Sequence, residues 1–469
     1  MLFNSIQFIY FFPIVLLLYF LSPYKWRWLV LLICSYYFYM SWNVDYVFLI
    51  LFTTIISYGA AIMIERSKTQ KTKKIYLATS VVASLGVLFF YKYFNFIGSS
   101  LNDVFGSINS SLQVPYLKLL LPVGISFYTF QTLSYTIDVY RGEIATEKHF
   151  GIYALYVSFF PQLVAGPIER STRLLPQFRE KNNFKLDNIV KGLKWVIFGF
   201  FMKLVIADRL SLYVDSVYNN VYQHDGATFI VATFFFAFQI FGDFAGYSSI
   251  AIGVARIMGF DLMTNFKRPY FATSVTDFWR RWHISLSTWF RDYFYIPMGG
   301  NRVGVPRWYL NLFLTFLVSG LWHGANWTFV IWGALHGIYI VLENYFKLQV
   351  NKDKKISIFS RVFRTLVVFI LVDFAWIFFR ANNVTEAFHV VKSIFDFSGE
   401  IFYDFKVFFY AAIGLFILFI NDLIVENNPN SIIENSKLNN KVVIYFAILV
   451  CLILFIGVFN GGQFIYFQF

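Results

Sequence analysis

Long apolar runs alternate with short polar connections along almost the whole chain. About 20 apolar residues suffice for a helix to cross the hydrocarbon core of a bilayer. We therefore predict about eleven helical spans, near residues 6–22, 28–42, 44–64, 75–97, 117–138, 192–208, 228–256, 328–346, 365–380, 407–421 and 442–460. The shorter runs 150–166 and 308–322 are interpreted as re-entrant segments. No polar connection is long enough for a separate soluble domain, so one helical membrane domain is expected over residues 1–469.

Composition and charge support a multi-pass membrane protein. The chain is 58% hydrophobic and 22% aromatic but only 14% charged, which is unlike a soluble domain. Its formal net charge of +13 is spread between the apolar runs, as in cytoplasmic loops, so no nucleic-acid partner is expected. Residues 65–74 are strongly basic and 98–116 contain no Lys or Arg, which places the first connection inside and the second outside.

The aromatic and basic connection 277–293 is predicted to be one amphipathic helix at the membrane surface. At about 100° per residue, its aromatic positions share one arc, and Arg280, Arg281 and Arg291 lie on the other. His283 lies at the border of the two faces. Its ring either reaches an aqueous pocket or bonds a backbone carbonyl as a structural residue.

His323 is an ionisable residue between two apolar runs, where such groups are costly and often functional. Gly320 and Gly324 bracket it and predict a break in the helix, which is tolerated at membrane depth only inside protein or beside a cavity. A neutral imidazole accepts a proton from a hydroxyl or acts as a nucleophile near neutral pH. A packing role is the alternative. Trp322 and Asn326 are further pocket candidates.

Two other polar residues lie within predicted spans. Asp243 must be neutral, paired or hydrated there, and both a structural pairing and a catalytic role are open. His336 lies beside Gly333 and Gly337, a spacing that lets another helix approach closely, and is interpreted as a packing residue. The histidines match no metal-ligand spacing, so no metal is expected.

Several motifs together resemble the membrane-bound O-acyltransferase superfamily. They are FWRRWHISLS at 278–287, RDY at 291–293, PMGGN at 297–301, LWHGANW at 321–327, FPQLVAGPIER at 160–170 and LPVGISF at 121–127. The similarity covers most of the chain and is greatest to the bacterial polysaccharide branch, which includes transferases for alginate, peptidoglycan and teichoic acid. This resemblance implies an all-α integral membrane fold of many helices around a central tunnel.

The resemblance also implies an activity and a location. An acyl group, expected to be acetyl, would pass from acetyl-CoA or another cytoplasmic thioester across the bacterial inner membrane to O-acylate an extracytoplasmic polysaccharide. His323 matches the family's essential histidine and His283 its second position. The ending FIYFQF at 464–469 is similar to an aromatic signature whose tyrosine, here Tyr466, would carry the acyl group to a separate extracytoplasmic acyltransferase. No permanently bound cofactor is expected.

The mechanism expected from this resemblance assigns His323 as general base or nucleophile. His283 would orient the thioester or stabilise the oxyanion. Arg280, Arg281 and Arg291 would hold the phosphates of coenzyme A, since guanidinium groups suit phosphate, or would bind anionic lipid headgroups.

Two other functions are compatible with the sequence. One is a transporter or flippase for a polysaccharide or lipid carrier, with His323 and Asp243 as a proton relay. Such a protein would need ionisable residues in several spans or repeated halves, and the chain has few of the former and no visible repeat. The other is a non-catalytic subunit of a polysaccharide secretion complex.

Overall fold

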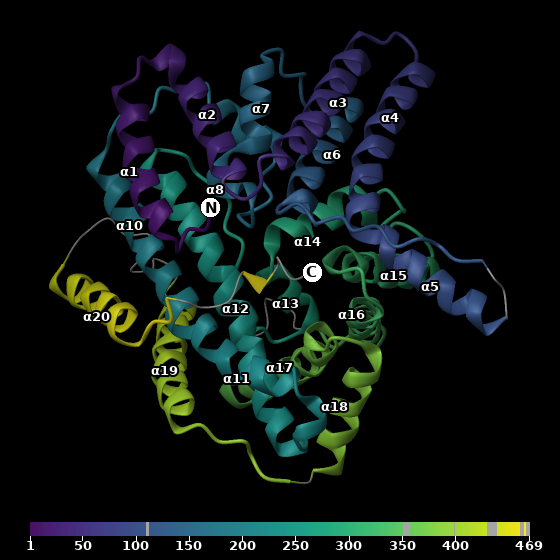
Figure 1. Cartoon of the computed structure of the whole chain (residues 1–469), viewed down its shortest axis with the longest axis vertical. Coiled ribbons are helices and arrows are strands. Elements are labelled where there is room, and N and C mark those ends of the chain that lie inside the picture. The colour runs from purple at the N-terminus through teal and green to yellow at the C-terminus, as the bar shows by residue number, and fades with distance from the viewer. Residues whose placement is uncertain (109–111, 350–356, 398, 429–438, 460–463, 466–469) are drawn as a thin grey trace. The chain divides into compact units, whose positions relative to one another are not determined.

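The described part of the chain is entirely helical. The computed structural model describes residues 1–108, 112–349, 357–397, 399–428, 439–459 and 464–465. Every regular element in these residues is a helix, and no strand occurs among them (Figure 1). The predicted all-α class is therefore confirmed.

The helices group into two compact units. The first comprises residues 1–189 and 254–263, and the second comprises 190–253 and 264–469. Two helices contain the boundaries between the units, namely α10 (Leu186–Phe200) and α12 (Gly226–Ile257).

The first unit contains nine further α-helices among its described residues. They are α1 (Ile6–Leu21), α2 (Arg27–Met40), α3 (Tyr46–Arg66), α4 (Gln70–Leu88), α5 (Phe94–Ser107), α6 (Ile125–Arg141), α7 (Phe150–Ser158), α8 (Phe160–Leu163) and α9 (Ser171–Gln177). Helices α3, α4 and α6 pack against one another, and α2 packs against α7. The buried Ser57 and Tyr153 hydroxyls share a hydrogen bond of 2.7 Å, which links α3 to α7.

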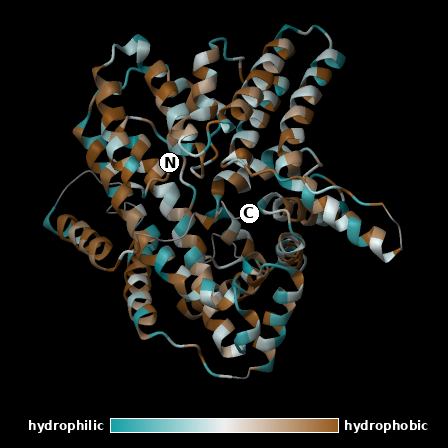
Figure 2. Ribbon diagram, in the orientation of Figure 1, coloured by the Kyte–Doolittle hydropathy of each residue, from teal (hydrophilic) through white to brown (hydrophobic). Residues whose placement is uncertain are grey.

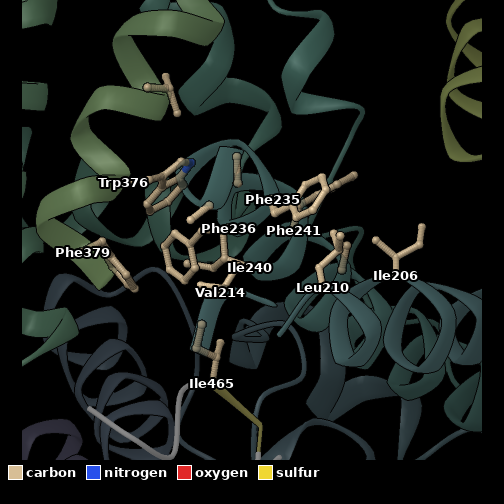
Figure 3. Close-up of a cluster of buried hydrophobic side chains, with 14 of the residues drawn as sticks. Ile206, Leu210, Val214, Phe235, Phe236, Ile240, Phe241, Trp376, Phe379 and Ile465 are labelled. Carbon is tan, nitrogen blue, oxygen red and sulfur yellow. The ribbon is translucent and has the colours of Figure 1, made fainter. Parts of the chain in front are cut away.

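The second unit contains the histidines of interest. Its further helices are the π-helix η3 (Phe201–Ala207), α11 (Asp208–Tyr218), α13 (Val275–Arg281), α14 (Ile284–Phe290), the π-helix η6 (Arg291–Tyr295), α15 (Val305–His323), α16 (Trp327–Tyr345), α17 (Ile358–Arg380), α18 (Val384–Asp396), α19 (Phe405–Asn427) and α20 (Asn440–Ile456). Its buried hydrophobic cluster draws side chains from η3, α11, α12 and α17, and includes Ile465 near the end of the chain (Figure 3).

Five helical segments in the described residues are long and apolar enough to cross a membrane. They are Tyr46–Arg66, Gln70–Ser107, Gly226–Ile257, Ile358–Arg380 and Phe405–Asn427. The helices Ile6–Leu21 and Asn440–Ile456 are also apolar but shorter. Apolar residues cover much of α3, α19 and α20 (Figure 2). The chain is thus a multi-pass helical membrane protein, while the predicted number of eleven spans is not confirmed.

Two predicted helices differ in their observed extent. The span predicted over 117–138 begins only at Ile125, because Pro115 and Pro122 interrupt the preceding stretch and Gly124 adopts a left-handed conformation with φ of 76°. The prediction of a single amphipathic helix over 277–293 was wrong. This stretch is divided into α13, α14 and η6, and His283, with φ of 41°, separates the first two.

Candidate active site

A helical hairpin places His323 at a break in the backbone. His323 is the last residue of α15, and Gly324 turns the chain into an extended conformation with φ of −157° and ψ of 150°. Asn326 then caps α16, because its side-chain oxygen accepts a 3.1 Å hydrogen bond from the Thr328 N–H. Its amide nitrogen donates to the Asn382 carbonyl at 2.9 Å. The predicted helix break is confirmed. Asn326 lies in the turn of the hairpin, where its side chain caps the start of α16.

Glycines allow α15 and α16 to pack closely. A Cβ atom on Gly320 would lie 2.3 Å from the Phe329 carbonyl oxygen, and one on Gly333 would lie 2.5 Å from that of Phe316. Larger residues would therefore force the two backbones apart. The predicted close approach at Gly333 is confirmed, and it fixes the position of the helix end that carries His323.

The His323 ring is enclosed by aromatic side chains. It is only 4% exposed, and its centroid lies 5.0 Å from the Trp332 ring and 5.5 Å from the Phe379 ring. Trp322 precedes it on α15 and is half-buried. The nearest partner of chemical interest is His283, whose ring centroid lies 6.5 Å from that of His323. The structure therefore brings together the two histidines that were predicted separately.

His283 is held by Asn265, which the sequence did not single out. The Ile284 N–H donates to the Asn265 carbonyl at 2.9 Å, and the Ser285 N–H donates to the Asn265 side-chain oxygen at 3.2 Å. The same side-chain oxygen lies 3.1 Å from Nδ1 of His283. These bonds explain why α13 does not continue into α14, since Asn265 binds the N–H groups at the start of α14.

The Asn265 contacts define the tautomer of His283. A backbone N–H only donates, so the side-chain atom facing Ser285 must be the oxygen, and Nδ1 of His283 must carry the proton that this oxygen accepts. Burial lowers the pKa of His283 well below its usual range, and the neighbouring His323 lowers it further. The ring is therefore neutral near pH 7, with its accepting lone pair on Nε2.

A cavity of about 430 Å³ lies beside the hairpin. Its lining includes the side chains of Arg280 and Arg291, and it extends to Ser319 on α15. Ser319 is one helical turn before His323, and residues at this spacing share a helix face. The cavity therefore connects an arginine-bearing surface with the helix that ends at His323.

The three predicted arginines occupy different environments. Arg280 and Arg291 line the cavity, and Arg291 also pairs with Asp292 through a 2.7 Å contact. Arg281 is not part of the lining. Its guanidinium lies 3.0 Å from Asp277 on the same helix and 3.0 Å from Glu426 on α19, so both carboxylates pair with its charge.

His336 and Tyr466 complete the set of predicted residues. His336 is fully buried on α16 and accepts a 3.3 Å hydrogen bond from the Trp279 indole, which agrees with a packing role. Tyr466 lies outside the described residues, so its prediction is not tested by the structure.

Asp243 is paired with a lysine that the sequence did not reveal. Its carboxylate lies 2.7 Å from Nζ of Lys203, which also contacts Asp208 at 2.8 Å. The structural pairing that was one of the two roles open for this acid is therefore observed, with Lys203 as the partner.

These features together define a class of protein. It is a helical membrane protein in which two buried histidines neighbour each other, one of them at the turn of a helical hairpin, and a cavity lined in part by Arg280 and Arg291 borders that hairpin. Imidazole groups in such a setting suit proton transfer during attack on a carbonyl group.

Comparison with known proteins identifies the family. Residues 144–381 match the family described as MBOAT, membrane-bound O-acyltransferase. The chain is 40% identical over 401 residues to a probable alginate O-acetylase, AlgI, of Pseudomonas aeruginosa. The aligned region covers 85% of this chain and 75% of the relative. It is 36% identical over 433 residues to a peptidoglycan O-acetyltransferase of Helicobacter pylori, covering 85% and 80%. A teichoic acid D-alanyltransferase of Streptococcus thermophilus is 30% identical over 254 residues, covering 51% and 61%.

The chain therefore belongs to the membrane-bound O-acyltransferase family and is an O-acyltransferase. The matched region contains both His283 and His323. Membership in an enzyme family favours catalysis over the transporter and the non-catalytic subunit that the sequence left open.

Proposed function

We propose that this enzyme moves an acetyl group from cytoplasmic acetyl-CoA to an extracytoplasmic polysaccharide, acting in the inner membrane of a bacterium. The observation that carries the proposal is the buried pair of His283 and His323, with 6.5 Å between their ring centroids, beside the arginine-lined cavity. The names of two relatives, an alginate O-acetylase and a peptidoglycan O-acetyltransferase, support both an acetyl group and a polysaccharide acceptor.

The proposed reaction begins with transfer to a hydroxyl group of the chain itself. The Tyr466 hydroxyl gives its proton to His323 as its oxygen attacks the thioester carbonyl carbon. The C–S bond then breaks, and the imidazolium returns the proton to the leaving thiolate. The products are an O-acetyl tyrosine and a free thiol. In the alternative order, a ring nitrogen of His323 takes the acetyl group first and passes it to the hydroxyl.

The tautomer of His283 narrows its proposed role. An oxyanion requires a hydrogen-bond donor, whereas neutral His283 uses its only N–H at Nδ1 toward Asn265. Stabilisation of the oxyanion by neutral His283 would therefore need the opposite tautomer. We assign His283 as an acceptor at Nε2, where it orients the attacking hydroxyl or the departing thiol.

The donor is proposed to bind in the cavity. Arg280 and Arg291 would hold the phosphates of coenzyme A, because guanidinium groups bind phosphate with strong, charge-assisted hydrogen bonds. Arg281 is excluded from this proposal because it is occupied by Asp277 and Glu426. An acetyl group on Tyr466 would then be collected by a separate extracytoplasmic acyltransferase, which delivers it to the polysaccharide.

The test of the catalytic pair is a substitution with a matched control. We expect His323→Ala to abolish acetyl transfer from radiolabelled acetyl-CoA by the purified protein, without loss of membrane abundance. His389→Ala is the control, because this half-buried histidine packs against Tyr222 on a different part of the unit. Transfer at the normal rate by His323→Ala would overturn the proposal.

The role of Tyr466 has its own test. Tyr466→Phe removes only the hydroxyl, so we expect label to be lost from the protein and polysaccharide acetylation to stop in cells. Intact polysaccharide acetylation would remove Tyr466 from the pathway and leave the test of His323 unaffected.

A further inference from the structure

Three ionisable side chains meet in the buried interior of the second unit. Lys203 lies in η3, Asp208 begins α11 and Asp243 lies within α12. The lysine nitrogen contacts the two carboxylates at 2.8 and 2.7 Å, and all three side chains are 8% exposed or less. Removing such groups from water is costly, and a buried ion pair is weak evidence for stability. Their presence therefore requires another explanation.

The second oxygen of Asp243 supplies that explanation. Oδ1 faces Lys203, whereas Oδ2 accepts a buried 2.7 Å hydrogen bond from the backbone N–H of Ile465, 222 residues further along the chain. The Ile465 side chain is 3% exposed and belongs to the same buried hydrophobic cluster as Val214 and Ile240 (Figure 3). The C-terminal segment is thus bound through both its backbone and its side chain.

Phe464 connects this attachment to the histidine pair. Its ring centroid lies 5.0 Å from that of Tyr247 and 5.9 Å from that of Phe244. The Phe244 ring also contacts His283, with 4.5 Å between ring centroids. Phe244 therefore contacts both the bound segment and His283.

Two further hydrogen bonds attach the chain a few residues before Phe464. The Val458 N–H donates to the Leu204 carbonyl at 3.0 Å, and the Arg209 guanidinium donates to the Ile456 carbonyl. Both partners belong to the same region as the ion cluster, since Leu204 follows Lys203 and Arg209 follows Asp208. Residues on either side of the undescribed stretch 460–463 are therefore attached to one structural region.

We propose that Asp243, paired with Lys203, is an internal binding site for residues 464–465 and thereby restrains the residue that follows them in the chain, Tyr466. Tyr466 is the residue that directly follows the bound Ile465. This inference rests on the proposed function, in which the Tyr466 hydroxyl accepts the acetyl group. Asp243 is here a positioning residue and takes no part in bond making.

A carboxylate is needed at position 243 because two donors approach it from different directions. In Asp243→Asn, one of the two oxygens becomes an NH₂ group. An NH₂ group facing the Lys203 ammonium would place two donors and like partial charges together, so the amide oxygen turns to Lys203. The NH₂ group then faces the Ile465 N–H, whose hydrogen bond is lost. Asp208→Asn is a matched control, since Asp208 contacts Lys203 through a single oxygen that the amide retains.

Hydrogen exchange of the full-length protein in nanodiscs tests the binding site directly. Fragment spectra of overlapping C-terminal peptides would follow the Ile465 amide. We expect it to exchange about tenfold faster in Asp243→Asn, because a charge-assisted hydrogen bond is lost, and within about twofold of the unchanged protein in Asp208→Asn. Unchanged exchange in Asp243→Asn would refute the binding site, whatever the role of Tyr466.

Kinetics test the positioning role. Asp243→Asn should lower kcat for acetylation of the chain by about a hundredfold, as expected for a displacement of about 1 Å, and leave KM for acetyl-CoA unchanged. Ile465→Pro removes the backbone N–H that donates to Asp243 and leaves the side chains of Lys203, Asp208 and Asp243 unchanged. It should likewise lower kcat and leave KM for acetyl-CoA unchanged. Faster exchange with a normal kcat would overturn the positioning role. The proposed function itself is tested separately by Tyr466→Phe and His323→Ala.

Discussion

Substitution of Gly320 by alanine should separate the α15–α16 hairpin and misplace His323. The added Cβ would lie 2.3 Å from the Phe329 carbonyl oxygen and 2.9 Å from Cα of Gly333. Both neighbours are backbone atoms, so no flexible side chain can move aside. The first distance is more than 1 Å below the 3.4 Å at which ordinary contacts begin, so the helices must shift by a comparable amount.

The expected effects on stability and on catalysis differ in size. Overpacking costs about 1–3 kcal/mol, and the higher helix propensity of alanine returns about 1 kcal/mol of this. The net loss in the free energy of unfolding is therefore about 0–2 kcal/mol. A displacement of about 1 Å at reacting groups, in contrast, lowers a rate by about a hundredfold. His323 lies three residues after Gly320 on the same helix, so the shift reaches it directly.

The assay is acetyl transfer from labelled acetyl-CoA by purified protein, together with its thermal unfolding temperature. The matched control is Gly86→Ala on α4, because no described atom lies within 4 Å of the Cβ that it would add. We expect kcat to fall about a hundredfold only in Gly320→Ala. If that variant turns over within twofold of the unchanged enzyme, the close packing of the hairpin does not control the site.

The remaining predictions concern charge. Asn265→Asp places a carboxylate beside Nδ1–H of His283 and should raise the pKa of that ring. The acidic limb of the pH profile of kcat should therefore move to higher pH. If the limb does not move, the tautomer assignment is contradicted. In the unchanged protein, burial lowers the pKa of His283 below its value of about 6.5 in the unfolded chain. As the pH falls, the unfolded state therefore binds this proton before the folded state does. The melting temperature should consequently fall as the pH drops below about 6.5. Arg280→Ala should raise KM for acetyl-CoA, and an unaltered KM would favour lipid headgroups as its partner. Arg281→Ala should leave KM unchanged but lower the melting temperature, since it breaks the contacts with Asp277 and Glu426.

Local signals explain what the sequence predicted well. Apolar runs identified the helices because burial in a bilayer requires continuous apolar surface. Gly324 predicted the break at His323, and Gly333 predicted a close helix contact, because a missing Cβ has a direct steric consequence. These properties depend on a residue and its immediate neighbours, so they can be read without knowledge of the fold.

Distant partners explain what the sequence did not reveal. The periodicity of 277–293 favoured one helix, but Asn265, 18 residues before His283, binds the N–H groups that begin α14. Similarly, the partner of Asp243 is Lys203, 40 positions earlier, in a region that reads as an ordinary apolar span. Neither pairing has a local pattern, since each arises only when separate helices meet.

A single stretch of α12 links the attachment of the C-terminal segment to the support of His283. Asp243 binds the Ile465 N–H, and Phe244 contacts both Phe464 and His283. One turn later, Ser248 accepts a 3.2 Å hydrogen bond from the amide nitrogen of Asn265, whose oxygen fixes His283. Residues 243–248 thus carry both the attachment of the C-terminal segment and the support of His283. Because a helix is stiff over so short a length, the distance between these two attachments is set by α12 itself. Changes elsewhere in the fold would move the histidine and the tail together, which explains why charged and polar groups are kept here at a cost that apolar packing would avoid.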